Sequence, residues 1–254
     1  MTPNKTPYRI IIPYLPSAAQ GRELEYAIAG WRQHFIEPHI IYVVGEGLDA
    51  IRWMHAPDVQ LIESKRVPDA PGQYRQHMDY VSCLRKVRAL HPDEEGFILV
   101  ADDCYAVNDF DIADVKLLKM LEPDFSFRVD SPNPWRRDKM KTKQALLDAG
   151  KPTRNFTTHL PQWFDWKLLE ELWNIYDMEH SSYVVEDLYY NTYCARRIPF
   201  HLNKDTDNFK CGIYEQGITK ERLDAAGKSK IWITNSPQGW SPELETWLQY
   251  RLLF

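Results

Sequence analysis

Short segments rich in β-branched residues alternate with helical patterns over the first hundred residues, and this alternation constrains the fold most. Expected strands are Arg9–Pro13, Ile40–Val44 and Val59–Ile62. Amphipathic helical spacing is found over Glu23–Phe35 and over Gln73–Leu90. Because strands joined through helices pair in parallel, the sequence predicts an α/β fold with a mixed, mainly parallel sheet flanked by helices.

Size and composition favour one domain over residues 1–254. The chain is 44% hydrophobic and 13% aromatic, which is enough for a substantial core. Its 31 basic and 36 acidic residues are mixed, so no global field favours an anionic partner. The four cysteines form no C-x-x-C pair and are expected to be reduced thiols. No apolar run approaches a membrane span, so we expect a cytoplasmic protein with no membrane span.

The second half of the chain has a different character. Asp124–Val129 is a candidate strand, and the Pro-, Lys- and Arg-rich stretch Asp130–Arg154 predicts a loop that is flexible or closed by a ligand. Helices are expected over Trp166–Tyr176 and Val185–Cys194, and a final strand and helix over Ile231–Phe254.

Two adjacent carboxylates follow a strongly apolar segment. Phe97–Ala101 is expected to be a strand, and Asp102 and Asp103 come directly after it. Like charges at the end of a buried strand are costly unless a positive partner lies beside them. A divalent cation, alone or with a nucleotide diphosphate, would neutralise them. Acidic residues in this position also serve as helix caps and turn formers, and that reading stays open.

Three segments in this order carry a family resemblance: the E-L-x-Y helix in Glu23–Ile28, the strand Ile41–Glu46, and Phe97–Asp103 with its paired carboxylates. Over roughly residues 8–110 the chain resembles GT-A-type glycosyltransferases and is most similar to the Stealth-like capsular sugar-phosphate transferases. Thr158–Pro161 adds a weaker similarity. The chain departs from the family pattern in two places. The segment Arg9–Tyr14 replaces an Asp-led opening strand, and Cys104 stands where a D-x-D motif would place its last carboxylate.

The resemblance implies a GT-A-like, Rossmann-like fold with a nucleotide-donor half over about residues 8–110 and an acceptor half over about residues 111–254. It implies a nucleotide-sugar donor, a carbohydrate or other hydroxyl acceptor, and Mn²⁺ or Mg²⁺ as the cofactor. Asp103 is the expected direct metal ligand, and Asp102 is expected to hold the ribose or a metal-bound water. His201 is a candidate late metal ligand, although a lone histidine is a weak signal.

Two arginines are candidates for contact with the donor pyrophosphate. Arg75 and Arg85 lie on or just before the helix that precedes the acidic strand. Arg75 follows a loop-to-helix junction, where backbone N–H groups favour phosphate. Solvated side chains are the alternative for both.

The candidate catalytic residues lie in the second half. Glu186 or Asp187 would take the proton of an acceptor hydroxyl in an inverting transfer, and helix capping is the alternative for both. His159 is expected in extended backbone near an X-Pro step, either pointing into the cleft or serving a structural role.

Other functions remain open at this stage. A degenerate GT-A-like domain would bind a carbohydrate or a protein through its nine Trp and fourteen Tyr residues without catalysis. A nucleotidyltransferase is disfavoured because the loop after the first strand, Pro13–Gly21, has a single glycine. A nucleic acid acceptor is the least favoured alternative, since the basic stretch Arg136–Lys143 lies in a chain of net charge −5.

Overall fold

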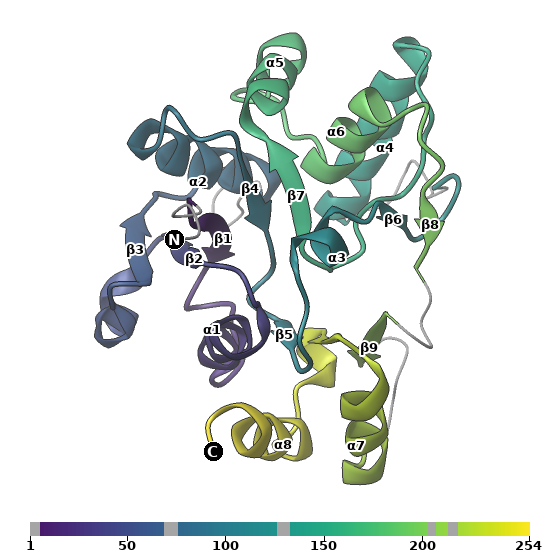
Figure 1. Ribbon diagram of the computed structural model, residues 1–254. Coiled ribbons are helices and arrows are strands. Elements are labelled where there is room, and N and C mark those ends of the chain that lie inside the picture. The colour runs from purple at the N-terminus through teal and green to yellow at the C-terminus, as the bar shows by residue number, and fades with distance from the viewer. Residues whose placement is uncertain (1–5, 69–75, 126–132, 203–206, 213–217) are drawn as a thin grey trace, which may run out of the picture.

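The computed structural model describes residues 6–68, 76–125, 133–202, 207–212 and 218–254 (Figure 1). The strands are β1 (Tyr8–Tyr14), β2 (His39–Gly45), β3 (Val59–Glu63), β4 (Gly96–Leu99), β5 (Cys104–Ala106), β6 (Lys119–Met120), β7 (Gln162–Asp165), β8 (Phe200–His201), β9 (Asn208–Cys211) and β10 (Trp232–Asn235). The helices are α1 (Glu23–His34), α2 (Gln76–Leu90), α3 (Ile112–Lys116), α4 (Pro134–Asp148), α5 (Trp166–Tyr176), α6 (Val185–Tyr193), α7 (Lys220–Ser229) and α8 (Pro242–Leu252), with 3₁₀ turns η1 (Leu48–Met54) and η2 (Pro237–Gly239).

A five-stranded sheet of order β3-β2-β1-β4-β7 forms the centre of the molecule. Strands β1 to β4 pair in parallel, and β7 joins β4 in the antiparallel direction. The expected α/β class with a mainly parallel, helix-flanked sheet is therefore confirmed.

The apolar strands bury both faces, as expected for a parallel sheet covered by helices. On β1, Ile10 and Ile12 pack in one cluster with Trp31 of α1, while Ile11 points to the other face and packs in a cluster with Leu84 of α2. Successive side chains of a strand point to opposite faces, so one β-branched run contributes to two cores.

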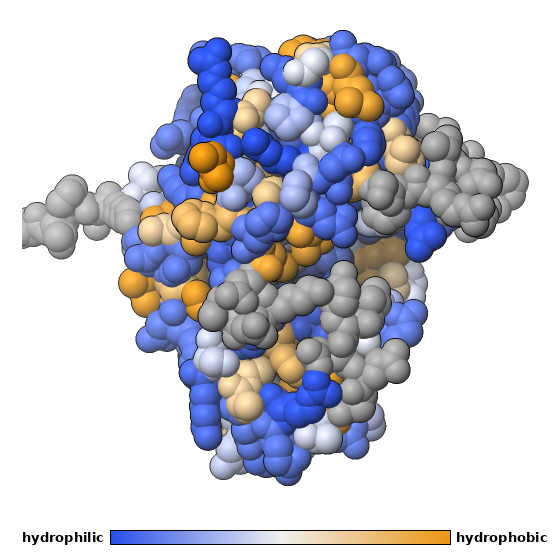
Figure 2. Space-filling view, turned by 90° about the vertical axis from the view of Figure 1, so that its right-hand side faces the viewer, coloured by the Kyte–Doolittle hydropathy of each residue, from blue (hydrophilic) through white to orange (hydrophobic). Residues whose placement is uncertain are grey.

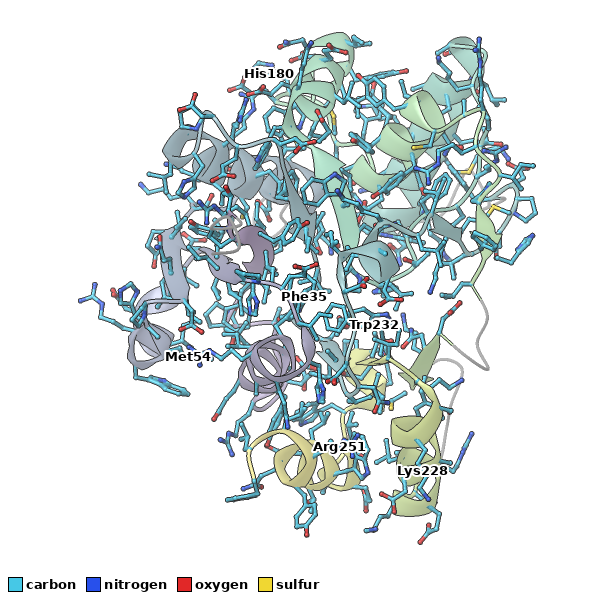
Figure 3. The ribbon with its side chains drawn as sticks, in the orientation of Figure 1. Phe35, Met54, His180, Lys228, Trp232 and Arg251 are labelled. Atoms are coloured by element: carbon cyan, nitrogen blue, oxygen red, sulfur yellow. The ribbon has the colours of Figure 1, made fainter. Side chains whose placement is uncertain are left out.

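Helix α1 has a second partner, a smaller sheet of order β5-β10-β9. A Cβ at Gly30 would lie 2.6 Å from the carbonyl oxygen of Ala106, so the glycine permits the close approach of α1 to β5. Phe35 and Trp232 lie close together in this seam (Figure 3), and Phe110 packs between them with ring centroids at 5.0 and 4.3 Å respectively. Helices α7 and α8 pack on the small sheet in a cluster that also includes Tyr26 of α1 (Figure 1).

The expectation of a loop over Asp130–Arg154 was wrong, because α4 occupies most of this stretch. Asn133 caps the helix through a hydrogen bond from the Trp135 N–H, Pro134 takes the first helical position, and strong helix formers follow. Of the candidate strand Asp124–Val129, Asp124 and Phe125 are not in a strand, and the other positions lie outside the described residues.

The other major expectations were confirmed within a few residues. The helices expected at Glu23, Trp166 and Val185 all form, as do the final strand and helix. None of the described helices is long and apolar enough to cross a membrane. The face shown in Figure 2 is mostly hydrophilic, with small apolar areas between charged ones.

Candidate functional site

A cavity of about 780 Å³ lies at the carboxyl ends of the parallel strands. Its wall includes Tyr14 at the end of β1, Gly45 at the end of β2, Ser64 directly after β3 and Asp102 after β4. Strand β2, which follows β1 in the chain, pairs with one edge of β1, and β4 pairs with the other edge. In open α/β sheets a crevice opens where the strand order reverses in this way, and ligands bind there.

Three carboxylates gather at this crevice: Asp102 and Asp103 after β4, and Glu23 at the start of α1. Burial raises the pKa of Asp102 well above its usual range, and the charges of Asp103 and Glu23 raise it further. Burial also raises the pKa of Asp103 to about 6, although Lys210 acts in the opposite direction. The crevice therefore concentrates negative potential that a bound cation would relieve.

The local contacts hold Glu23 in place but leave part of Asp103 without a partner. Glu23 accepts hydrogen bonds of 2.6 Å from the Gln20 N–H and from Nδ2 of Asn235. Asp103 Oδ1 is buried and has no hydrogen-bond partner among the described residues. Buried polar atoms are normally paired, so the described surroundings of this oxygen leave its hydrogen-bonding capacity unused.

These residues fit a divalent cation of the kind that shares its coordination with a substrate. The described part of the chain contains no group of three or more His, Cys, Asp or Glu side chains able to hold a metal by itself. Mg²⁺, however, is usually bound by one or two carboxylates together with substrate phosphates. Asp102 and Asp103 supply that number. His201 lies elsewhere, exposed on the short strand β8, and it does not line the cavity.

Helix α4 forms another wall of the cavity. Asn133, Trp135, Arg137, Asp138 and Lys141 all line it. Arg137 and Lys141 are one helical turn apart and therefore share a face of the helix. Most of the stretch expected to be a loop is thus a helix that forms a partly basic wall.

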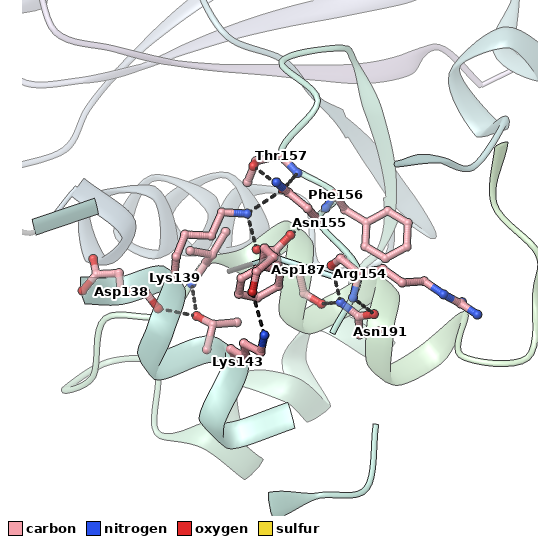
Figure 4. Close-up of polar contacts among 12 residues, drawn as sticks. Asp138, Lys139, Lys143, Arg154, Asn155, Phe156, Thr157, Asp187 and Asn191 are labelled. Atoms are coloured by element: carbon pink, nitrogen blue, oxygen red, sulfur yellow. Dashed lines mark hydrogen bonds and ion pairs between the residues drawn. The ribbon is translucent and has the colours of Figure 1, made fainter. Parts of the chain in front are cut away.

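Asp187 is committed to a buried ion pair rather than to the cavity (Figure 4). Lys139 of α4 and Asp187 of α6 are both fully buried and in direct contact. Lys139 Nζ also donates to Asn155 Oδ1 at 2.7 Å, and Asp187 Oδ1 accepts from the Phe156 N–H at 2.7 Å. The pair therefore fastens α4, α6 and the Asn155–Phe156 loop together. Asp187 is not brought to the cavity wall.

Glu186 has a different environment from its neighbour. It is half-buried, and its Oε2 atom is enclosed with no hydrogen-bond partner among the described residues. Burial raises the pKa of Glu186 to about 7, with a further rise from Asp187 opposed by Lys139. Glu186 does not line the cavity, but its charge, like that of Asp102, raises the pKa of the cavity-lining residue Tyr80. Neither Glu186 nor Asp187 makes a side-chain cap of α6.

His159 lines the cavity, but the expected extended backbone was wrong. Its φ is 59°, in the left-handed region, and the residue that precedes Pro161 is Leu160. The imidazole is open to the cavity yet surrounded by protein, and this desolvation, with Lys210 and Lys139, lowers its pKa to about 4. The ring is therefore neutral at pH 7 and suited to hydrogen bonding.

Of the two arginines expected at the donor pyrophosphate, the structure describes only Arg85. Arg75 lies outside the described residues. Arg85 donates to Glu179 Oε2 at 2.9 Å and lies over the Trp173 ring, 5.3 Å from its centroid. It does not line the cavity.

Several site residues were missed at the sequence level. Glu23 and Lys210 join Asp103 only through tertiary structure; the partner of Glu23, Asn235, is 212 positions away. Arg137 and Lys141 were visible as local basic charge but were assigned to a loop. Their i, i+4 spacing after an Asn-Pro cap was the signal that marks them as one helix face.

No family model matches the chain, and a search of the curated proteins finds no match to it. Fold and site define a mainly parallel α/β protein with an acidic crevice and a basic helix wall in one cavity.

Proposed function

We propose that this chain is a glycosyltransferase, or a close relative that transfers a sugar phosphate, and that it uses a nucleotide-activated donor with a divalent metal. The observation that carries the proposal is the Asp102–Asp103 pair at the crevice between β1 and β4, where the enclosed Asp103 Oδ1 has no hydrogen-bond partner among the described residues. The resemblance of residues 8–110 to GT-A-type enzymes supports the same reading.

The nucleotide is expected to lie over the ends of β1 to β3, with its diphosphate at the acidic crevice. Asp103 would hold Mn²⁺ or Mg²⁺, and Asp102 the ribose or a metal-bound water. The cation would supply neutralisation of the charge that develops on the leaving diphosphate. Tyr14, whose pKa is raised by burial and by Asp102, remains a neutral hydrogen-bond donor at the edge of this region.

Glu186 is the favoured candidate base of the two, because Asp187 is committed to its ion pair with Lys139. The raised pKa of Glu186, about 7, matches the value at which a general base is most effective near neutral pH. Asp187 serves Glu186 indirectly, because its ion pair with Lys139 fixes the start of α6. His159 is expected to orient the acceptor as a neutral ring.

The test is release of nucleoside diphosphate from UDP-, GDP-, CDP- and ADP-sugars with Mn²⁺, across a panel of sugar acceptors. Asp103→Asn should lower the rate by roughly 100-fold, the scale of one preorganised electrostatic contact. Asp93→Asn is the matched control, because Asp93 is exposed in the loop at the opposite end of β4. Release without Mn²⁺, or unchanged release in Asp103→Asn, would remove the carboxylate pair from the reaction. Nucleotide binding without turnover would favour the non-catalytic alternative.

A further inference from the structure

The cavity has distinct regions whose order follows the order of the strands. Glu46, Lys65 and Arg66 lie where β2 and β3 end, and the crevice carboxylates lie where β1 and β4 end. The α4 wall follows on the side of β7, since α4 packs against α6 and α6 packs against β7 through Tyr189 and Phe164. A donor lying over β3, β2 and β1 therefore leaves the α4 wall to the second substrate.

The charges on the α4 wall have the opposite sign to those of the crevice. The crevice carries Glu23, Asp102 and Asp103, whereas the α4 wall presents Arg137 and Lys141 around a single carboxylate. That carboxylate, Asp138, accepts a hydrogen bond of 2.5 Å from Ser182. The amino-terminal turn of α4 also borders the cavity, and its partial positive charge adds to that of the two side chains.

Contacts behind the α4 wall hold this helix in place. The Lys139–Asp187 pair lies directly behind it, and Thr142 Oγ1 accepts from the Val184 N–H at 2.9 Å. The ammonium of Lys141 lies 4.4 Å from the centroid of the Tyr183 ring, which orients its side chain. Two cations one turn apart suit one anionic group with two or three oxygens.

We propose that the α4 wall, through Arg137 and Lys141, binds a negatively charged group, a phosphate or a carboxylate, on the acceptor. This inference rests on the proposed function, which assigns the donor diphosphate to the metal at Asp102 and Asp103. Trp135 beside the cations provides an aromatic face against which a sugar ring of that acceptor can stack.

The experiment measures binding of glucose 6-phosphate, glucuronate and neutral glucose by calorimetry, with chelator present and no nucleotide. Wild-type protein should bind at least one of the two anionic sugars about tenfold more tightly than glucose, and the comparison of the two distinguishes phosphate from carboxylate. Arg137→Ala/Lys141→Ala should abolish the preference, and Arg137→Lys/Lys141→Arg should retain it. Lys167→Ala/Lys228→Ala, which removes two exposed charges from α5 and α7, is the control and should behave as wild type.

A second measurement separates this inference from the proposed function. Arg137→Ala/Lys141→Ala should keep the Mn²⁺-dependent binding of the nucleotide. If the double variant loses nucleotide binding and keeps sugar binding, the cations serve the donor and the inference is overturned. Equal sugar binding by the double variant and wild type overturns it as well. Anion binding through these cations in a protein that binds no nucleotide would overturn the proposed function and leave the anion site standing.

Discussion

The two acidic pairs of this chain look alike in sequence and differ in structure. Glu186–Asp187 has a lysine buried with it, since Lys139 contacts Asp187 directly. Among the described residues, neither Asp102 nor Asp103 forms an ion pair with a cation, and Asp103 Oδ1 has no hydrogen-bond partner; the charge of Lys210 lowers the pKa of Asp103. A buried carboxylate with a counter-charge, such as Asp187, supports the fold, whereas one without a counter-charge, such as Asp103, is costly when ionised until a ligand neutralises it.

Removal of the buried lysine should have the largest effect on stability. Lys139→Met leaves Asp187 buried without its counter-charge, so the free energy of unfolding should fall by about 3–5 kcal/mol. Urea unfolding measures this, with Lys167→Met, an exposed position on α5, as the control. Lys139→Met/Asp187→Leu should recover much of the loss. A loss below about 1 kcal/mol for the single variant would contradict the contrast between the two pairs.

Removing a carboxylate charge from the crevice should raise the free energy of unfolding rather than lower it. Asp103→Asn removes a carboxylate that is costly when ionised, so the free energy of unfolding at pH 8 should rise by about 1 kcal/mol. Thermal unfolding against Asp93→Asn checks it. A destabilised Asp103→Asn protein would mean that the Asp103 carboxylate supports the fold rather than a ligand.

The raised pKa values of Asp103 and Glu186 also predict a pH dependence of stability. Because the folded state holds their protons more tightly than the unfolded state, their destabilising contribution is absent below about pH 4 and complete above about pH 8. The melting temperature should therefore fall less across this window in Asp103→Asn/Glu186→Gln than in wild type. Identical pH profiles for the two proteins would contradict the assigned burial of these groups.

The raised pKa of Glu186 also predicts how the rate of transfer depends on pH. A base with a pKa of about 7 must lose its proton to act, so kcat/KM should rise through pH 7 and then level off. Glu186→Gln should lose that rise together with roughly 10²–10⁴-fold of the rate. If Asp187→Asn instead shifted the profile while Glu186→Gln kept it, the roles of the two residues would be reversed.

The smallest effect is expected at Arg85, which forms an exposed ion pair with Glu179 away from the cavity. Arg85→Ala should lower the free energy of unfolding by less than about 1 kcal/mol. It should also leave nucleotide binding unchanged. A large loss of nucleotide affinity would show that the arginine moves to the donor on binding.

Local pattern was enough to predict most of the central sheet. The apolar, β-branched runs at Ile10, Ile41 and Ile98 indicate strands by themselves. The run at Ile98 also predicted that Asp102–Asp103 follows the end of a strand. Lys139 carries no such signal: its partner is 48 positions away, so the sequence could not distinguish a buried lysine from a solvated one. For the same reason Asp187 could not be separated from Glu186.

The most direct test of the central claim is to titrate free Mn²⁺ by electron paramagnetic resonance in the presence of UDP, GDP, CDP or ADP. Wild-type protein should remove Mn²⁺ from solution with one of these nucleotides and bind it more weakly alone. Asp103→Asn should lose this binding, and Asp93→Asn should keep it. Equal Mn²⁺ binding by Asp103→Asn and wild type would contradict the claim that the uncompensated carboxylates hold a metal and a nucleotide diphosphate together.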